Sequence, residues 1–170
     1  MLFRSDAPIE LALTVEPVFD GAGDRQATLT WCRKLTAMYR AWAGKRRMHS
    51  SDVASRSKDK ETPILLVSGF GAHRVLVPEA GLHVFEPFEG SGNRVTARVR
   101  LAVVPLGDVP AAKERRLVIE AIDAAPRPNN VVRRYREEPP LVRDAAGQWR
   151  SGRLDLVLGG EFDLLQAGQR

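Results

Sequence analysis

The stretch RVTARVRLAVVP, residues 94–105, alternates apolar and polar side chains in the way that a β-strand with one buried face requires. The apolar positions share one face of the predicted strand: Val95, Ala97, Val99, Leu101 and Val103. The other face carries Arg94, Thr96, Arg98 and Arg100. We therefore predict a half-buried strand whose outer face is basic.

A long helix is predicted to cover the buried face of that strand. From Ala27 to Lys45, large apolar residues recur at helical spacing, and Asp24 is a suitable N-cap. The apolar stripe consists of Trp31, Leu35, Met38, Tyr39 and Trp42. Such a stripe can be part of a core or a platform on which nucleic-acid bases stack. We favour the core, since the basic residues of this segment fall off the stripe.

Shorter apolar runs predict further strands at residues 9–17, 117–122 and 131–135, and a strand that runs into a glycine turn over residues 62–74. Residues 75–85 are a further apolar stretch. The polar and charged stretch near residues 45–60 predicts a mobile loop. In the tail, Gly159 and Gly160 separate two short helical turns. We expect one α+β domain over residues 1–170. It has an antiparallel sheet of about four to six strands, one long amphipathic helix packed on it and short C-terminal helices.

The composition excludes several classes of protein. The 170 residues are 44% hydrophobic and 28% charged, as in an ordinary folded domain. No apolar run approaches the length of a membrane span, and Asp6 and Pro8 come too early for a signal peptide. We therefore expect a cytoplasmic protein with no membrane partner.

Metal and disulfide chemistry are not expected either. Cys32 is the single cysteine, which excludes an internal disulfide and a cysteine-based metal site. The histidines His49, His73 and His83 lie far apart in the sequence, without metal-ligand spacing. No phosphate-binding glycine loop of the Walker type occurs, and no activated nucleophile is evident. We predict no enzyme, no cofactor, no metal and no small-molecule substrate.

The positive charge is carried almost entirely by arginine. The net charge is +5, with 21 arginines against 5 lysines. A guanidinium group binds phosphate with two parallel hydrogen bonds and stacks on bases, whereas an ammonium group acts as a point charge. This bias indicates contact with nucleic acid, and it is equally typical of a GC-rich genome.

Three blocks, read in order, resemble bacterial class I peptide chain release factors. Residues 11–48 are similar to the family's strand, glycine turn and Met-Tyr helix. Residues 67–105 are similar to its run through Gly-Val-His and Ser-Pro-Phe to a strand that ends in proline. Residues 131–168, from VVRRY to LLQAG, are similar to its C-terminus. Together these blocks cover most of the chain in the family's order.

The resemblance also implies what is missing. The family's catalytic domain, with the Gly-Gly-Gln loop that hydrolyses peptidyl-tRNA, lies between the second and third blocks, and residues 106–130 are too few for it. Ala146-Gly147-Gln148 falls in the third block, so it is not a displaced catalytic loop. The family's N-terminal helical domain is expected to be absent as well. What remains resembles the decoding-site domain alone.

The codon-reading residues of the family have degenerate counterparts here. Glu86-Pro87-Phe88 occupies the place of Ser-Pro-Phe, and the loop through Val95 and Thr96 occupies the place of Arg-His-Thr-Ser. Glu86 replaces a hydroxyl that donates and accepts with an anion that only accepts. Val95 stands where the family has histidine, so its stacking and hydrogen bond are lost. Each change argues against the reading of stop codons.

Two functions remain open from these residues. The first is a release-factor-like protein without peptidyl-tRNA hydrolase activity, which binds the ribosome or structured RNA through Arg94, Arg98, Arg100, Arg133, Arg134 and Arg136. A solvated protein face is the plain alternative for these arginines. The second function is a protein–protein interaction module or adaptor subunit without RNA binding. A split factor, whose partner chain supplies Gly-Gly-Gln, is possible but no residue here motivates it.

Overall fold

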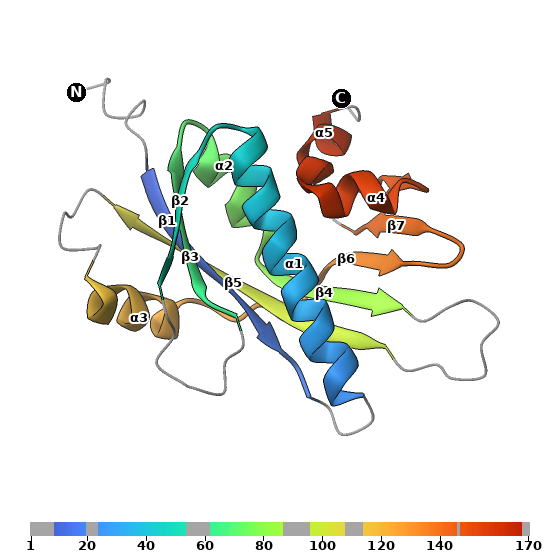
Figure 1. Cartoon of the computed structure of the whole chain (residues 1–170), viewed down its shortest axis with the longest axis horizontal. Helices are drawn as coiled ribbons and strands as arrows, with labels where there is room; N and C mark the ends of the chain where they lie inside the picture. Colours follow the sequence, from blue (N-terminus) through green and yellow to red (C-terminus); the bar gives the residue numbers. More distant parts are fainter. Residues whose placement is uncertain are drawn as a thin grey trace.

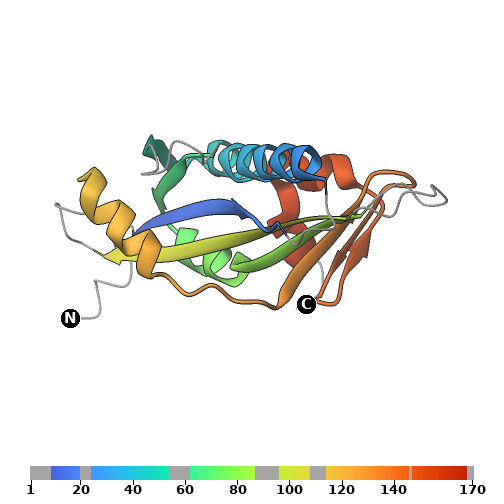
Figure 2. The same ribbon diagram turned by 90° about the horizontal axis from the view of Figure 1, so that it is seen from below.

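Eight strands form one sheet in a computed structural model that describes residues 9–19, 24–53, 62–86, 96–107, 114–145 and 147–167. The strand order is β2-β3-β1-β5-β4-β6-β7-β8, and the helix α1 lies along one side of the sheet (Figures 1 and 2). The strands are β1 (Ile9–Pro17), β2 (His49–Val53), β3 (Ile64–Gly69), β4 (Gly81–Glu86), β5 (Ala97–Gly107), β6 (Val131–Arg136), β7 (Leu141–Asp144) and β8 (Arg150–Ser151). The helices are α1 (Arg25–Lys45), α2 (Ala72–Leu76), the 3-10 turn η2 (Val77–Glu79), α3 (Arg115–Ala124), α4 (Leu154–Leu156), the π-helical turn η4 (Val157–Glu161) and α5 (Phe162–Ala167).

The sheet differs from the predicted one in two respects. It has eight strands where about four to six were expected. It is also mixed, because β4 and β6 run parallel while the other pairs are antiparallel. The parallel pair arises because the chain leaves β5, forms α3 and only then enters β6. A crossover connection of this kind is what parallel neighbours need.

The main core lies between α1 and the sheet, as the sequence predicts. Asp24 caps the helix by accepting a hydrogen bond from the backbone N–H of Gln26 at 2.9 Å. The predicted stripe is buried throughout: Trp31, Leu35, Met38, Tyr39 and Trp42. It packs on the alternate residues of β1 and β5 that point toward the helix, among them Leu13 and Leu101. The aromatic residues of α1 are therefore core residues.

A second, smaller core lies on the other side of the sheet, and it corrects one prediction. Residues 117–122 were expected to form a strand, yet they lie in α3. Val118, Ile119 and Ile122 occupy one face of that helix and pack against Ala12 and Leu66 of the sheet. A short apolar run fits a strand or a buried helix equally well, and here the helical spacing decides.

The side chain of Arg127 links α3 to the sheet through hydrogen bonds. Its Nη1–H donates to the carbonyl oxygen of Ile122, near the C-terminal end of α3, at 2.8 Å. Its Nε–H donates to the carboxylate of Glu16 in β1 at 2.7 Å. One side chain thus satisfies a helix-end carbonyl and joins the helix to the sheet.

The predicted polar loop contains the edge strand β2. Its side chains are exposed or half-buried, so no alternation of apolar and polar residues marks it in the sequence. Asp52 of this strand pairs with Arg40 of α1 at 3.0 Å. Residues 54–61 of the predicted loop lie outside the described residues.

The predicted C-terminal helical turns are present and meet at Gly160. This residue has a φ of 99°, and a Cβ there would lie 2.5 Å from the backbone nitrogen of Trp42. Only glycine permits both the backbone conformation and the close approach to α1. The approach seats Phe162 in the core, with its ring centroid 5.5 Å from that of Tyr39.

Candidate nucleic-acid interface

Alternate residues of β4 and β6 point to opposite faces of the sheet. The ring of Phe85 lies 4.9 Å from that of Trp31 in α1, and the ring of Tyr135 lies 4.7 Å from it. These two side chains define the inner face, which is turned toward α1. Their neighbours Val84 and Arg134 therefore point to the other side, the outer face.

Four arginines stand in register across the outer face. Arg98 pairs with Val84, Val84 with Arg134, Arg134 with Arg143, and Arg143 with Arg150. We call Arg98, Arg134, Arg143 and Arg150 the arginine row. Crossing five adjacent strands, it extends over about 19 Å. Arg98 and Arg150 are exposed, and the side chains of Arg134 and Arg143 are 41% and 48% exposed.

Glu86 contributes an acidic side chain to this surface. It is the last residue of β4, and its carboxylate accepts from Arg143 at 2.7 Å and lies 3.7 Å from Arg134. At 18% exposure its side chain is more covered than either arginine. Glu86 therefore holds the two central arginines of the row and offsets one of their charges.

Of the remaining predicted codon-loop residues, the structure describes only Thr96. Thr96 is half-buried and directly precedes β5. Pro87, Phe88 and Val95 lie outside the described residues, as does the predicted RNA contact Arg94.

Two of the predicted RNA contacts are engaged with neighbouring loops. Arg100 donates from Nη2 to the side-chain oxygen of Asn129 at 2.7 Å and from Nε to a backbone carbonyl of the same segment. Arg136 donates from Nε to the carbonyl oxygen of Pro139 at 3.1 Å. These arginines hold the segments before and after β6, so they contribute charge to the outer face from fixed positions.

The prediction that Arg133 contacts RNA is wrong. Its side chain is on the inner face and 0% exposed. Nη1 and Nη2 donate to the two carboxylate oxygens of Glu79, each at 2.8 Å, and Nε donates to Asp144 at 2.9 Å. A guanidinium buried with two carboxylates and no access to solvent cannot reach a phosphate.

Three further side chains complete this buried network. The hydroxyl of Tyr39 donates to Glu79 at 3.1 Å, and the hydroxyl of Tyr135 accepts from Arg133 at 3.0 Å. Nε2 of His83 lies 2.8 Å from the carbonyl oxygen of Glu79, which can only accept. Nε2 therefore carries the proton, and Nδ1 accepts from Tyr135 at 2.9 Å.

The network fixes the protonation of its members. Burial lowers the pKa of His83 to about 4, so the imidazole is neutral at pH 7. Burial also raises the pKa of Tyr39 and of Tyr135. For Glu79, burial acts to raise the pKa, but the charge and hydrogen bonds of Arg133 outweigh it and the pKa is lowered. Arg133 and Glu79 thus form an ionised pair beside the neutral side chains of His83, Tyr39 and Tyr135.

Sequence reasoning missed Arg143 and Arg150. Both lie in short strands, β7 and β8, that were not predicted. The signal that could have revealed Arg143 is the alternation in LVRD, residues 141–144, where Val142 is buried and Arg143 is exposed.

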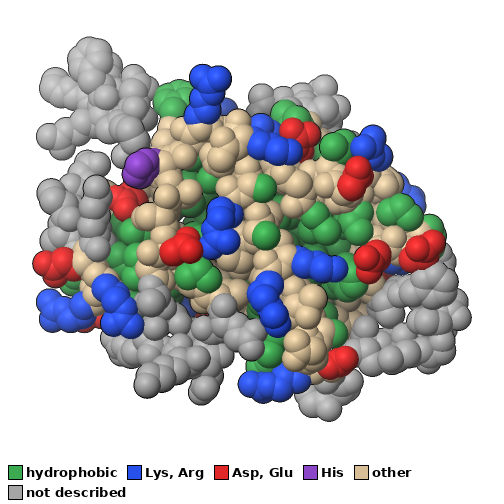
Figure 3. Space-filling view, in the orientation of Figure 1, with side chains coloured by type: hydrophobic (Ala, Val, Ile, Leu, Met, Phe, Trp, Pro, Cys, Tyr) green, Lys and Arg blue, Asp and Glu red, His purple; other side chains and the backbone are tan. Residues whose placement is uncertain are grey.

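The exposed side of α1 forms a second basic surface, and its charge is partly compensated. All charged residues of this helix are basic: Arg25, Arg33, Lys34, Arg40 and Lys45. Figure 3 shows Lys and Arg side chains along the helix, with Asp and Glu to either side. Arg40 pairs with Asp52, and Lys45 lies 3.6 Å from Glu161.

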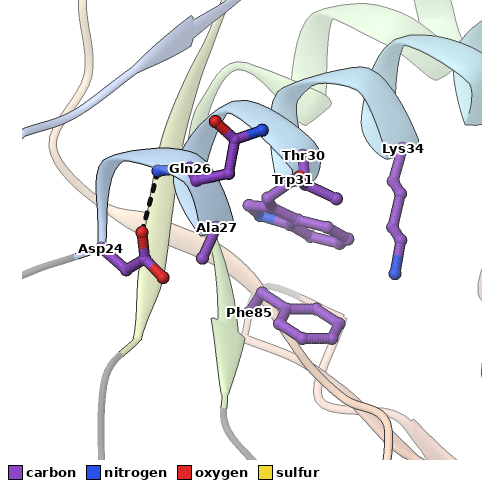
Figure 4. A pocket seen from close by; sticks show the side chains of 7 residues that line it. All are labelled: Asp24, Gln26, Ala27, Thr30, Trp31, Lys34 and Phe85. Atoms are coloured by element: carbon purple, nitrogen blue, oxygen red, sulfur yellow. Dashed lines mark hydrogen bonds between the residues drawn. The ribbon is translucent and has the colours of Figure 1, made fainter.

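A hollow of about 280 Å³ lies between the start of α1 and the end of β4 (Figure 4). It is lined by Asp24, Gln26, Ala27, Thr30, Trp31, Lys34 and Phe85. Its charged groups already have partners, because Asp24 caps the helix and the ammonium of Lys34 lies 5.3 Å from the centroid of the Phe85 ring. The charged side chains that line the hollow, Asp24 and Lys34, therefore already have contacts within the protein.

Among the described residues, no group of three or more His, Cys, Asp or Glu side chains could hold a metal ion. None of the described helices is long and apolar enough to cross a membrane.

The comparisons with known proteins point to one kind of fold. No family model matches the chain. Over 100 residues, 55% of this chain, the sequence is 34% identical to peptide chain release factor RF2 of Thermus thermophilus. The solved structure of RF2 from the same organism matches 98% of this chain and 68% of that chain, with a TM-score of 0.66 and 17% identity. The chain has a release-factor-like fold. In the sequence match, it spans 25% of the length of RF2.

Proposed function

We propose that this protein acts in translation as a release-factor-like ligand of the ribosome, or of another structured RNA, and does not hydrolyse peptidyl-tRNA. The observation that carries the proposal is the match of the release-factor-like fold over 98% of the chain. The basic outer face supports an RNA partner, because arginine side chains that neutralise phosphates supply most non-specific affinity for nucleic acids.

The connection between β5 and β6 supports the absence of hydrolysis. By the family resemblance, this is where a catalytic domain would be inserted. Here the connection contains α3, whose apolar face is buried on the sheet. The tripeptide Gly-Gly-Gln does not occur in the 170 residues. The near-match at Gly147-Gln148 lies in the β7–β8 turn, where the N–H of Gly147 donates to Asp144 at 2.6 Å.

Co-sedimentation tests the ribosome part of the proposal. The purified protein is centrifuged with ribosomes at low and at high salt, and we expect pelleting that high salt abolishes. A class I release factor serves as the positive control. If the protein stays in the supernatant at both salt concentrations, ribosome binding is refuted.

A release assay tests the catalytic part separately. Ribosomes carrying peptidyl-tRNA and a stop codon are mixed with the protein, and we expect no peptide release above the spontaneous rate. The same class I factor must release the peptide in parallel. Stop-codon-dependent release by this chain alone would refute the proposal.

The second candidate is a protein–protein interaction module without RNA binding. The observation in its favour is Glu86, whose carboxylate occupies the two central arginines of the row. Failure to pellet with ribosomes and with total RNA, at both salt concentrations, is the result that favours this function.

A further inference from the structure

We propose that the arginine row binds the phosphate backbone of double-helical RNA and does not read base sequence. The inference rests on the proposed function, and it names the part of the partner and the surface that meets it. Arg143 and Arg150, which have no place in the sequence-based prediction, supply half of the row.

The spacing of the row suits a polyanion. Its members stand on β5, β6, β7 and β8, and neighbouring strands of a sheet lie about 4.8 Å apart. Because the positions are in direct register, all four side chains leave the same face of the sheet. The row thus presents guanidinium groups in a line of about 19 Å rather than in a scattered patch.

The central pair of the row is already ordered. Arg134 and Arg143 are direct cross-strand neighbours, and two cations opposite one another repel. Glu86 stands beside both and removes much of this repulsion. Val84, between Arg98 and Arg134, is only 1% exposed, as expected where arginine stems lie over an apolar residue and their charged ends face water.

The distribution of aromatic residues selects the double helix over a single strand. Proteins that bind single strands combine a basic groove with aromatic side chains on which bases stack. Among the residues that the structure describes, the aromatic side chains nearest the row are on the inner face: Phe85 and Tyr135 pack on Trp31, and Trp149 is 3% exposed. The described outer face of β4 to β8 therefore offers charge without stacking. Contact with phosphates and sugars is how double-stranded RNA is mostly recognised.

The same distribution disfavours a protein partner. The described outer face of these strands shows no large exposed apolar side chain. Protein interfaces usually have aromatic and apolar side chains at their centre, whereas the centre of this surface is Arg134, Arg143 and Glu86.

The test compares two variants with equal change in charge. In the first, Arg134→Glu and Arg143→Glu reverse the centre of the row. In the matched control, Arg33→Glu and Lys34→Glu reverse two exposed residues on α1, on the other side of the sheet. Binding to a labelled RNA duplex of about 16 base pairs, the length that a double-stranded-RNA-binding domain covers, is followed by fluorescence anisotropy over a range of salt. Circular dichroism and thermal unfolding show that each variant is folded.

We expect R134E/R143E to raise the Kd at least about tenfold and to lower the salt dependence by about two phosphate contacts. The control should stay within about threefold of the unmodified chain, since it leaves the row intact. A control that loses binding as strongly as R134E/R143E would overturn the proposal. Equal affinity for a single strand of the same sequence would overturn it as well. So would polyglutamate that displaces the labelled duplex as effectively as unlabelled duplex RNA does.

Ribosome pelleting of the same proteins separates the two proposals. If the unmodified chain pellets with ribosomes but does not bind the duplex, the arginine row is refuted and the proposed function stands. If R134E/R143E loses both duplex binding and pelleting while the control keeps both, the row is the ribosome-binding surface.

Discussion

The two faces of the sheet between β4 and β8 both carry clustered charge, and they use it differently. On the inner face, Arg133 is enclosed with Glu79 and Asp144, and its guanidinium donates hydrogen bonds to both carboxylates. On the outer face, Arg134 and Arg143 share one carboxylate and remain about half exposed. Arg133 and Arg134 are neighbours in the chain, so residue type says nothing about role. Burial and the number of partners decide it.

The largest effect on stability is expected when Arg133 is removed. Arg133→Ala leaves the carboxylates of Glu79 and Asp144 buried without a cation, and we expect the free energy of unfolding to fall by about 3–5 kcal/mol. Arg134→Ala, the matched control on the outer face, should change it by no more than about 0.5 kcal/mol. Urea unfolding at pH 7 measures both. Similar losses for the two variants would contradict the division of roles.

Acid should weaken the inner face through His83. Burial lowers its pKa from the ordinary value of 6.5 to about 4 in the folded protein, so the unfolded chain binds more protons between these values. The contribution of His83 to the free energy of unfolding is fully present above pH 6.5. It is lost as the pH falls toward 4, and the loss amounts to about 3 kcal/mol.

Urea midpoints between pH 7 and pH 4.5 measure this loss. His83→Gln keeps a donor and an acceptor without titrating, and it should remove the part of the slope that lies between pH 6.5 and 4.5. If the slope of H83Q equals that of the unmodified protein, His83 is not its source.

A milder change tests whether the inner network needs every hydrogen bond. Tyr135→Phe keeps the ring that packs on Trp31 but removes the hydroxyl between Arg133 and His83. We expect the free energy of unfolding to fall by about 1–3 kcal/mol, because two buried polar atoms lose a partner. Unfolding by urea at pH 7 is again the measurement, and an unchanged stability would show that the hydroxyl is dispensable.

The smallest effect is expected on the outer face. Glu86→Gln removes the anion between Arg134 and Arg143, and since the pair is partly exposed we expect a change in unfolding free energy within about 0.5 kcal/mol. The affinity for duplex RNA should rise about two- to fivefold, because phosphate no longer competes with a carboxylate. Anisotropy titration measures this change. Weaker binding would mean that Glu86 orders the arginines more than it opposes phosphate.

The pattern of the sequence was sufficient for the elements that cross the main core. β1 is the apolar run that ends at Pro17, and its residues 11–15 are buried on both faces of the sheet. In β5, the predicted inner residues Ala97, Val99, Leu101 and Val103 are buried, as is the aromatic stripe of α1. The pattern was insufficient for β2, whose side chains are all exposed or half-buried, and for α3, whose short apolar run has no unambiguous period.

The buried network could not have been predicted from local pattern. In VVRRY, residues 131–135, two adjacent arginines give no sign of which one is enclosed. The choice depends on Glu79, which lies 54 residues from Arg133 and reaches it only through the pairing of β4 with β6. The arginine row depends likewise on the register of five strands, which no single segment contains.

The position of α3 has a consequence for how this chain could change. The helix occupies the connection between β5 and β6, and it covers Ala12, Ile64 and Leu66. Replacing α3 with a new domain would expose this apolar surface to water. A domain inserted beside α3 would have to leave the ion pair between Arg127 and Glu16 intact. The small core that the helix completes therefore opposes the insertion of a further domain between β5 and β6.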